Sequence, residues 1–295
     1  MTTFTASVII PSHNEGDKLV DTVGCVLRNS GDPLLEIVVV DDGSDDGSPE
    51  RVLERAAAAP IRVLRGQDLG VAHARNLGAK HARGDVLVFL DAHCYVRPGW
   101  LRALAATLEQ PSVGLVGPAC ASLMAGQGPF GCGMTFTDRR LSVAWLPARA
   151  TLPYAVPLVP GCGQAFRRDV FRRCGGYDSG MTRWGSEDHE ICLRVHGLGL
   201  AVAIVPQSMI FHFFRQRHGY RVEAAEVLHN LLRMAFVHLS DARFAQVVDA
   251  HRASPTLPRS LDLLEASDAR ARRDYWRAIR RRDDAWFRAW FAWAA

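Results

Sequence analysis

Asp91 and His93 lie two residues apart, directly after the apolar run of residues 86–90. In an extended segment, side chains at positions i and i+2 point the same way, so both groups can face one ligand. A carboxylate and an imidazole suit a divalent cation, and parallel sheets bind ligands at the carboxyl ends of their strands. A metal site is therefore one interpretation of this segment. The alternative is a turn in which Asp91 only caps the helix that follows Pro98.

An acidic run, residues 41–47, follows the apolar run of residues 37–40. Carboxylates at the end of a strand can accept hydrogen bonds from a nucleobase or a ribose. Asp/Gly runs of this kind also form solvated turns, and the run by itself leaves both interpretations open.

Residues 184–190, with the sequence WGSEDHE, contain a tryptophan followed three residues later by two adjacent acidic residues. If Ser186 caps a helix, Glu187 and Asp188 lie in its first turn, where the helix dipole favours carboxylates. Simple capping is therefore one interpretation. The other is an aromatic platform for a sugar ring beside a general base.

Residues 211–221, FHFFRQRHGYR, mix cations with aromatic rings. Such a loop can close over a diphosphate. The alternatives are a basic surface loop and, for His212, a histidine that packs in the core.

The elements that must position these groups alternate between strands and helices over the first 117 residues. A helical pattern over residues 19–27 ends at Gly31 and Pro33. This alternation predicts an α/β fold with a mostly parallel central sheet and helices on both faces. The expected strands are residues 8–10, 37–40, 61–64, 86–90 and 113–116.

The second half of the chain is less regular. Residues 118–165 are rich in Gly, Pro and Cys, which predicts irregular structure around a binding face. Helical patterns follow at residues 167–174 and 187–196, and a strand is expected at residues 200–205.

From residue 223 the chain is predicted to be helical, with a break at Pro255–Pro258. Near the C-terminus, tryptophans alternate with arginines, which predicts one amphipathic helix. It packs against the catalytic domain or a second subunit, or it lies on a membrane surface. Its apolar residues are Trp276, Ile279, Trp286, Phe287, Trp290, Phe291 and Trp293.

Composition limits the classes of function. The chain has 295 residues and a net charge of only +4, which gives a nucleic-acid role no support. Seven cysteines without a Cys-x-x-Cys pair predict reduced, buried thiols. We find no leader and no apolar run of the roughly 18 residues that a membrane span needs. We therefore expect a cytoplasmic protein, in contact with a membrane at most at its surface. Abundant Ala and Arg suggest a GC-rich bacterial genome.

Two nucleotide-binding motifs are missing. Residues 11–16 stand where a Gly-x-Gly-x-x-Gly motif would follow the first strand, which argues against a dinucleotide oxidoreductase. No P-loop sequence is present either.

Taken in order, these segments resemble the family-2 nucleotide-sugar glycosyltransferases of the GT-A fold. More narrowly, they are similar to the catalytic domain of the polypeptide N-acetylgalactosaminyltransferases. The resemblance covers about residues 6–222. We predict a catalytic domain over residues 1–222, with a nucleotide-binding half (1–117) and an acceptor and metal half (118–222), followed by the helical extension over 223–295 that the residue pattern indicates. The matching stretches are VIIPSHNE (8–15), VVDDGS (39–44), FLDAHC (89–94), WGSEDHE (184–190) and HFFRQRHGY (212–220).

The resemblance also implies roles for single residues. Asp91, His93 and His212 would bind the metal, and this donor set suits Mn²⁺ better than Mg²⁺. Glu187 and Asp188 would be catalytic. The residues implied in binding a UDP-sugar donor are Pro11, Ser12, Asn14, Glu15, Asp41, Arg75, Asp91, Ala92, Trp184, Arg215, His218 and Tyr220.

One position departs from the peptide-modifying enzymes. They carry Asn after the Glu of a Trp-Gly-Gly-Glu-Asn motif and retain the anomeric configuration, whereas this chain has Asp188. Inverting family-2 enzymes place an Asp there as the base. We therefore predict an inverting, metal-dependent transferase in which Asp188 deprotonates the acceptor.

Three alternatives remain at this stage. The first is a retaining UDP-GalNAc-type transferase that acts on a peptide or a small molecule. The second is a sugar nucleotidyltransferase, although residues 11–16 are not the Gly-rich, basic loop it needs. The third is a nucleotide-binding protein without catalysis, against which the intact acids and His93 argue.

Overall fold

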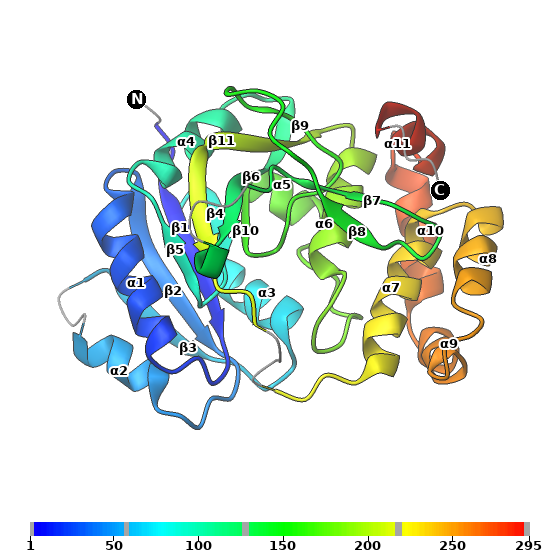
Figure 1. Ribbon diagram of the computed structural model, residues 1–295, viewed down its shortest axis with the longest axis horizontal. Coiled ribbons are helices and arrows are strands. Elements are labelled where there is room, and N and C mark those ends of the chain that lie inside the picture. Colours follow the sequence, from blue (N-terminus) through cyan, green and yellow to red (C-terminus); the bar gives the residue numbers. More distant parts are fainter. Residues whose placement is uncertain (1–2, 56–58, 126–129, 216–219, 292–295) are drawn as a thin grey trace.

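The computed structural model describes residues 3–55, 59–125, 130–215 and 220–291. At its centre lies a nine-stranded sheet in the order β3-β2-β1-β4-β10-β6-β11-β5, with β9 paired to β11 (Figure 1). The strands of this sheet are β1 (Ala6–Ser12), β2 (Leu34–Asp41), β3 (Ile61–Arg65), β4 (Val86–Leu90), β5 (Cys94–Val96), β6 (Val113–Ser122), β9 (Tyr154–Ala155), β10 (Gly163–Arg167) and β11 (Ala201–His212).

The first half of the sheet is parallel, as predicted. Strands β3, β2, β1 and β4 form parallel ladders, and all four coincide with the predicted apolar runs. Ser12 at the end of β1 pairs in register with Asp41 at the end of β2. The carboxyl ends of these strands therefore meet at one edge of the sheet.

The second half of the sheet is mixed, but β6 and β11 run in the same direction as β1 to β4, so the sheet is mostly parallel as predicted. Strand β10 runs antiparallel to β4 and β6, while β11 is parallel to β6 and antiparallel to β5. Residues 118–165, predicted to be irregular, include the end of β6, all of β9 and the start of β10. They also contain a short 3₁₀ turn, Leu123–Ala125, and a hairpin of β7 (Met134–Phe136) and β8 (Val143–Trp145).

Helices cover both faces of the sheet. One core cluster joins α1 (Asp17–Ser30) and α4 (Trp100–Leu108) to one face, with α2 (Ser48–Arg55) at its margin. A second cluster joins α3 (Val71–His81), α5 (Arg168–Arg173) and α6 (Glu187–Gly197) to the other face. Successive strand residues alternate between the two clusters, as Val8 and Ile9 do, because side chains on a strand point to opposite faces.

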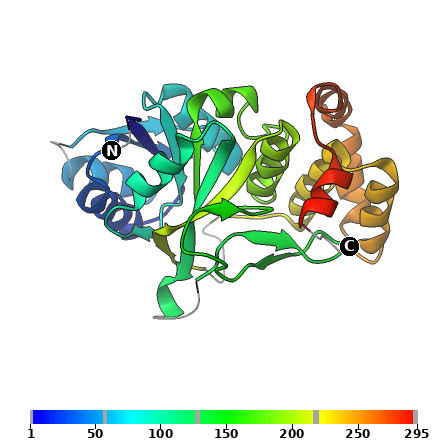
Figure 2. The same cartoon turned by 90° about the horizontal axis from the view of Figure 1, so that it is seen from above.

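Five helices follow the sheet and gather at the end of the molecule farthest from β3 (Figures 1 and 2). The expected break at Pro255–Pro258 falls around the start of α9. The helices are α7 (Ala224–His238), α8 (Asp241–Ala250), α9 (Leu257–Glu265), α10 (Ala269–Ile279) and α11 (Asp284–Phe291).

The prediction of one C-terminal amphipathic helix is wrong, because α10 and α11 are separate. The break has a tertiary cause: the backbone N–H groups of Arg281 and Arg282 donate to the carbonyl of Gly197, 2.7 and 3.2 Å away. Trp276 and Phe287 are each only 3% exposed and join the core cluster of α6. These residues therefore pack against α6, while Trp290 stays 63% exposed and Trp293 lies outside the described residues.

The same core cluster extends across residue 222, and the domain limits given above stay predictions. All seven cysteines are buried and unpaired. Over the described ranges, no helix combines the length and the apolar character needed to cross a bilayer.

Candidate active site

A cavity of about 490 Å³ opens at the edge of the sheet where β1 and β4 end. Its volume is that of a pocket for a small organic ligand. Most of the predicted site residues lie in its wall: Pro11, Ser12, Glu15, Arg75, Asp91, Ala92, His93, Trp184, Glu187, Asp188, His212, Arg215 and Tyr220.

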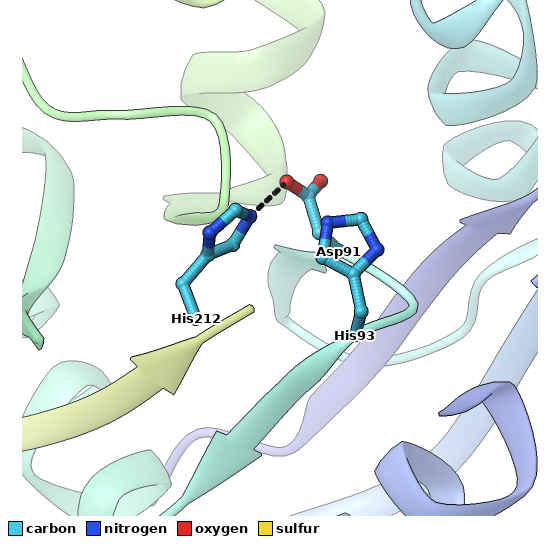
Figure 3. A group of neighbouring side chains, drawn as sticks. All are labelled: Asp91, His93 and His212. Atoms are coloured by element: carbon cyan, nitrogen blue, oxygen red, sulfur yellow. Dashed lines mark ion pairs between the residues drawn. The ribbon is translucent and has the colours of Figure 1, made fainter. Parts of the chain in front are cut away.

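Strand pairing brings His212 to Asp91 and His93. The last residue of β11, His212, pairs with Cys94 at the start of β5, and the N–H of Phe213 donates to the carbonyl of His93 at 3.1 Å. Asp91 follows directly on β4. Each of the three offers a ligand atom, and these atoms all lie within 4.8 Å of one another (Figure 3).

The donor set fits a divalent metal ion. Nε2 of His212 lies 3.5 Å from the Asp91 carboxylate, and the two imidazole rings are 4.7 Å apart. Burial would raise the pKa of Asp91, but His212 and Arg75 hold it well below its usual range, so the carboxylate stays charged. One carboxylate and two imidazoles match Mn²⁺, and we find no other cluster of three such ligands among the residues the structure describes.

Arg75, on α3, joins the metal cluster to the acids of α6. Its guanidinium donates to Glu187 at 2.8 Å, to Asp91 at 3.1 Å and to the carbonyl of Gly161 at 2.8 Å. Burial opposes the charge, yet the surrounding acidic groups raise the pKa of Arg75 above its usual value. These partners are all protein groups, and the implied role of Arg75 in binding a UDP-sugar donor stays a prediction.

Glu187 and Asp188 begin α6. Ser186 is at the N-cap position with φ of 67°, but its side chain makes no capping hydrogen bond. The interpretation in which Ser186 simply caps this helix is therefore wrong. Instead, the Glu187 carboxylate accepts from the N–H of Gly185 at 3.0 Å. Burial and the neighbouring Asp188 raise the pKa of Glu187, while Arg75 opposes this shift.

Both oxygens of Asp188 are held by backbone N–H groups. Oδ2 accepts from Gly161 at 2.8 Å and Oδ1 from His189 at 2.9 Å. A Cβ at position 161 would lie 2.9 Å from Nη2 of Arg75 and 3.1 Å from Cβ of Asp188, so the approach requires glycine.

Two predicted donor contacts, Asp41 and Asn14, do not line the cavity. The Asp41 carboxylate accepts from the N–H of Ser44 at 3.0 Å and pairs with Arg65. In the cavity wall stands Asp42, whose Oδ2 accepts from the N–H of Gly70 at 2.7 Å. His218, also predicted, lies outside the described residues.

Sequence reasoning missed one wall of the cavity. Met134 and Trp145 from the β7–β8 hairpin lie there with Phe214, and the rings of Trp145 and Phe214 are 6.3 Å apart. The signal available was a tryptophan inside a segment that we expected to be irregular. The cavity is also lined by Gly161, Arg183 and His189. No sequence pattern singled out any of these three residues as part of a site.

The sequence matches the family described as Glycosyl transferase family 2 over residues 7–175. A second match, to the N-terminal domain of galactosyltransferase, covers residues 140–219. Polypeptide N-acetylgalactosaminyltransferase 11 of Xenopus tropicalis is 34% identical over 257 residues, which is 80% of this chain and 43% of that protein. Polypeptide N-acetylgalactosaminyltransferase 3 of Drosophila melanogaster is 35% identical over 263 residues, which is 81% of this chain and 39% of that protein.

Among solved structures, GalNAc-T7 with UDP, GalNAc and Mn²⁺ superposes with a TM-score of 0.81 at 25% identity, covering 98% of this chain and 56% of that one. A mannosyltransferase from Pyrobaculum calidifontis with GDP-Man and Mn²⁺ shares the fold at a TM-score of 0.58 and 22% identity, covering 98% and 83%. Both neighbours confirm the predicted GT-A fold. The chain spans about two fifths of the length of these two curated relatives. Both come from animals, which counts against the bacterial origin suggested by composition.

Proposed function

The chain belongs to glycosyl transferase family 2, and from this premise we propose that it moves a sugar from a UDP-sugar to an acceptor nucleophile with a divalent metal, Mn²⁺. The observation that carries the proposal is the convergence of Asp91, His93 and His212 in one cavity. GalNAc-T7, whose fold this chain shares, was solved with UDP and Mn²⁺.

Asp91, His93 and His212 would hold the ion, which when bound supplies positive charge against the charge that develops on a departing diphosphate. Arg215 lies in the same wall and carries donors that match phosphate oxygens. Trp184, 40% exposed, offers a flat apolar face to a sugar ring.

For the stereochemical outcome, we propose retention, with UDP-GalNAc as the donor and a peptide or a small molecule as the acceptor. The named relatives support this choice over the inverting reaction that Asp188 suggested. Asp188 also has a structural role, because each of its carboxylate oxygens accepts a backbone N–H group.

The inverting reaction stays the second candidate, because Asp188 does line the cavity. The two are separated by NMR of the anomeric proton in the product formed from UDP-α-GalNAc. We expect an α-linked product that forms only with added divalent metal. A β-linked product would restore Asp188 as the base, and UDP-sugar turnover unaffected by chelation would remove the metal-dependent proposal.

The acceptor can be identified by testing a panel of hydroxyl-bearing peptides and small molecules. Mass spectrometry then detects the added sugar. We expect a mass increase of one N-acetylhexosamine on a subset of these acceptors. Transfer of other sugars with GalNAc rejected would overturn the proposed donor.

A further inference from the structure

Glu15 lies next to the metal cluster without belonging to it. The residue is 8% exposed, and one carboxylate oxygen, Oε2, receives two donors. These are Nδ1 of His93 at 3.2 Å and a guanidinium nitrogen of Arg215. Both donors belong to residues in the cavity wall, so a single oxygen atom joins two parts of the site.

The contact to His93 defines which ring nitrogen can bind a metal. An ionised carboxylate only accepts hydrogen bonds, so Nδ1 of His93 carries the proton in this contact. In the neutral ring, the form that binds a metal, Nε2 then keeps its lone pair. In Figure 3 one ring nitrogen of His93 faces Asp91 and the other points away from it. A carboxylate behind a ligating histidine fixes the tautomer and the ring orientation and makes the ligand more basic.

The backbone around Glu15 is held in place by the neighbouring loop. Asn14 and Gly16 have φ angles of 52° and 60°, and their N–H groups donate to Ser44 Oγ at 3.0 Å and Asp46 Oδ2 at 2.7 Å. The side chain of Asn14 in turn accepts from the N–H of Asp45 at 2.9 Å. Asn14 therefore serves the placement of Glu15 and not the wall of the cavity.

We propose that Glu15 is a positioning residue that orients His93 for the metal and connects the metal site to the diphosphate-facing Arg215. The proposal rests on the metal-dependent function proposed above. Arg215 shares the oxygen that holds His93, so a phosphate that draws Arg215 away leaves this oxygen to His93 alone. Metal and nucleotide binding are then coupled through Glu15, and such a coupling is reciprocal.

The test measures Mn²⁺ affinity by titration followed with EPR, without nucleotide, so that no turnover is involved. Glu15→Ala should bind Mn²⁺ about 10- to 100-fold more weakly, the range observed when such outer partners are removed. Glu15→Gln keeps an acceptor for Nδ1 and should recover part of the affinity. The matched control is Arg215→Ala, which removes the other partner of Glu15 and leaves the shared oxygen to His93 alone; it should bind Mn²⁺ at least as tightly as the unaltered protein and bind UDP more weakly.

Each outcome bears on a different claim. Unchanged Mn²⁺ affinity in a folded Glu15→Ala variant overturns the positioning role. The same holds if Glu15→Ala and Arg215→Ala both weaken UDP binding while neither weakens Mn²⁺ binding. Thermal unfolding of each variant checks that the fold persists, and Glu15→Gln carries the test if Glu15→Ala unfolds. If the unaltered protein itself binds no Mn²⁺, the proposed function fails first.

Discussion

At the scale of single residues, the side chains of the site are held in place by hydrogen bonds from their neighbours. Arg75 fixes Glu187 and Asp91 at once, and Gly161 lets Arg75 and Asp188 approach each other. Asp188 is held by two backbone N–H groups, which an amide oxygen can replace in part. The geometry of Asp188 therefore fits two roles, a structural one in the wall of the cavity and that of a general base.

Asp188→Asn distinguishes these roles. An Asn at this position still offers an oxygen to the N–H of Gly161, so we expect less than about a tenfold loss in transfer rate. Removal of a general base costs about 10²- to 10⁴-fold, and a loss of that size would support the inverting mechanism instead. Steady-state transfer assays measure this, with Asp91→Asn as the variant in which metal-dependent activity should disappear.

The acids Glu187 and Asp188 and the pair Asp91–His93, which all line the cavity, could be found from sequence because they form short motifs at the ends of elements. The position of His212 could not be derived from spacing. It depends on the pairing of β11 with β5, and β5 is a three-residue strand that no periodicity reveals. Only the resemblance to a family linked His212 to the other two ligands.

At the scale of elements, the buried strands β1, β2 and β4 were predictable because β-branched apolar runs mark strands covered on both faces. The edge strand β3 is only half-buried, yet its run of Ile and Val also marks it as a strand. Strand β10 was not, because its residues include Gly163, Gln164 and Arg167. Gln164 is fully buried and is held by Tyr177, whose hydroxyl donates to it at 2.7 Å. Its amide group is hydrogen-bonded by partners distant in the sequence, which sequence patterns do not reveal.

The C-terminal helices are attached to the catalytic domain by a buried ion pair. Arg233 of α7 is fully buried and donates to Asp178 through Nε at 2.8 Å and Nη2 at 3.0 Å. Asp178 lies between α5 and α6. The pair therefore connects the helical extension to the loop that leads to the site.

Arg233→Leu should lower the free energy of unfolding by up to about 3–5 kcal/mol, because it removes the two-bond partner of the buried Asp178 carboxylate and leaves only Arg272, 2.9 Å away, as its charged partner. Urea denaturation followed by circular dichroism measures the change. The control is Arg252→Ala, which breaks an exposed pair with Asp249 at 3.0 Å and should cost at most about 1 kcal/mol. Equal effects of the two substitutions would refute the role given to Arg233.

At the scale of the whole molecule, stability and pH are linked through a histidine of α6 that is buried against α11. His196 is 3% exposed, contacts the ring of Phe287 at 5.5 Å and lies 3.0 Å from the carbonyl oxygen of Pro157 through Nε2. Burial lowers the pKa of His196 from 6.5 to about 4. The unfolded chain therefore takes up a proton at higher pH than the folded one.

Stability from this group is complete above pH 6.5 and is lost as the pH falls from 6.5 through 4. At pH 5 the expected loss is about 2 kcal/mol. His196→Gln keeps a donor for Pro157 and does not titrate, so its unfolding free energy should fall less between pH 7.5 and pH 5 than that of the unaltered protein. Identical pH profiles in urea denaturation would show that His196 is not buried in its neutral form.

The central claim is that an aspartate and two histidines bind one cation beside a nucleotide diphosphate. Pulsed EPR of the protein with Mn²⁺ and UDP measures this directly, because the hyperfine couplings identify the nuclei next to the ion. We predict ¹⁴N couplings from imidazole together with ³¹P coupling from UDP, with the ¹⁴N signal reduced in His212→Ala. A spectrum with ³¹P coupling but no ¹⁴N coupling would contradict the account.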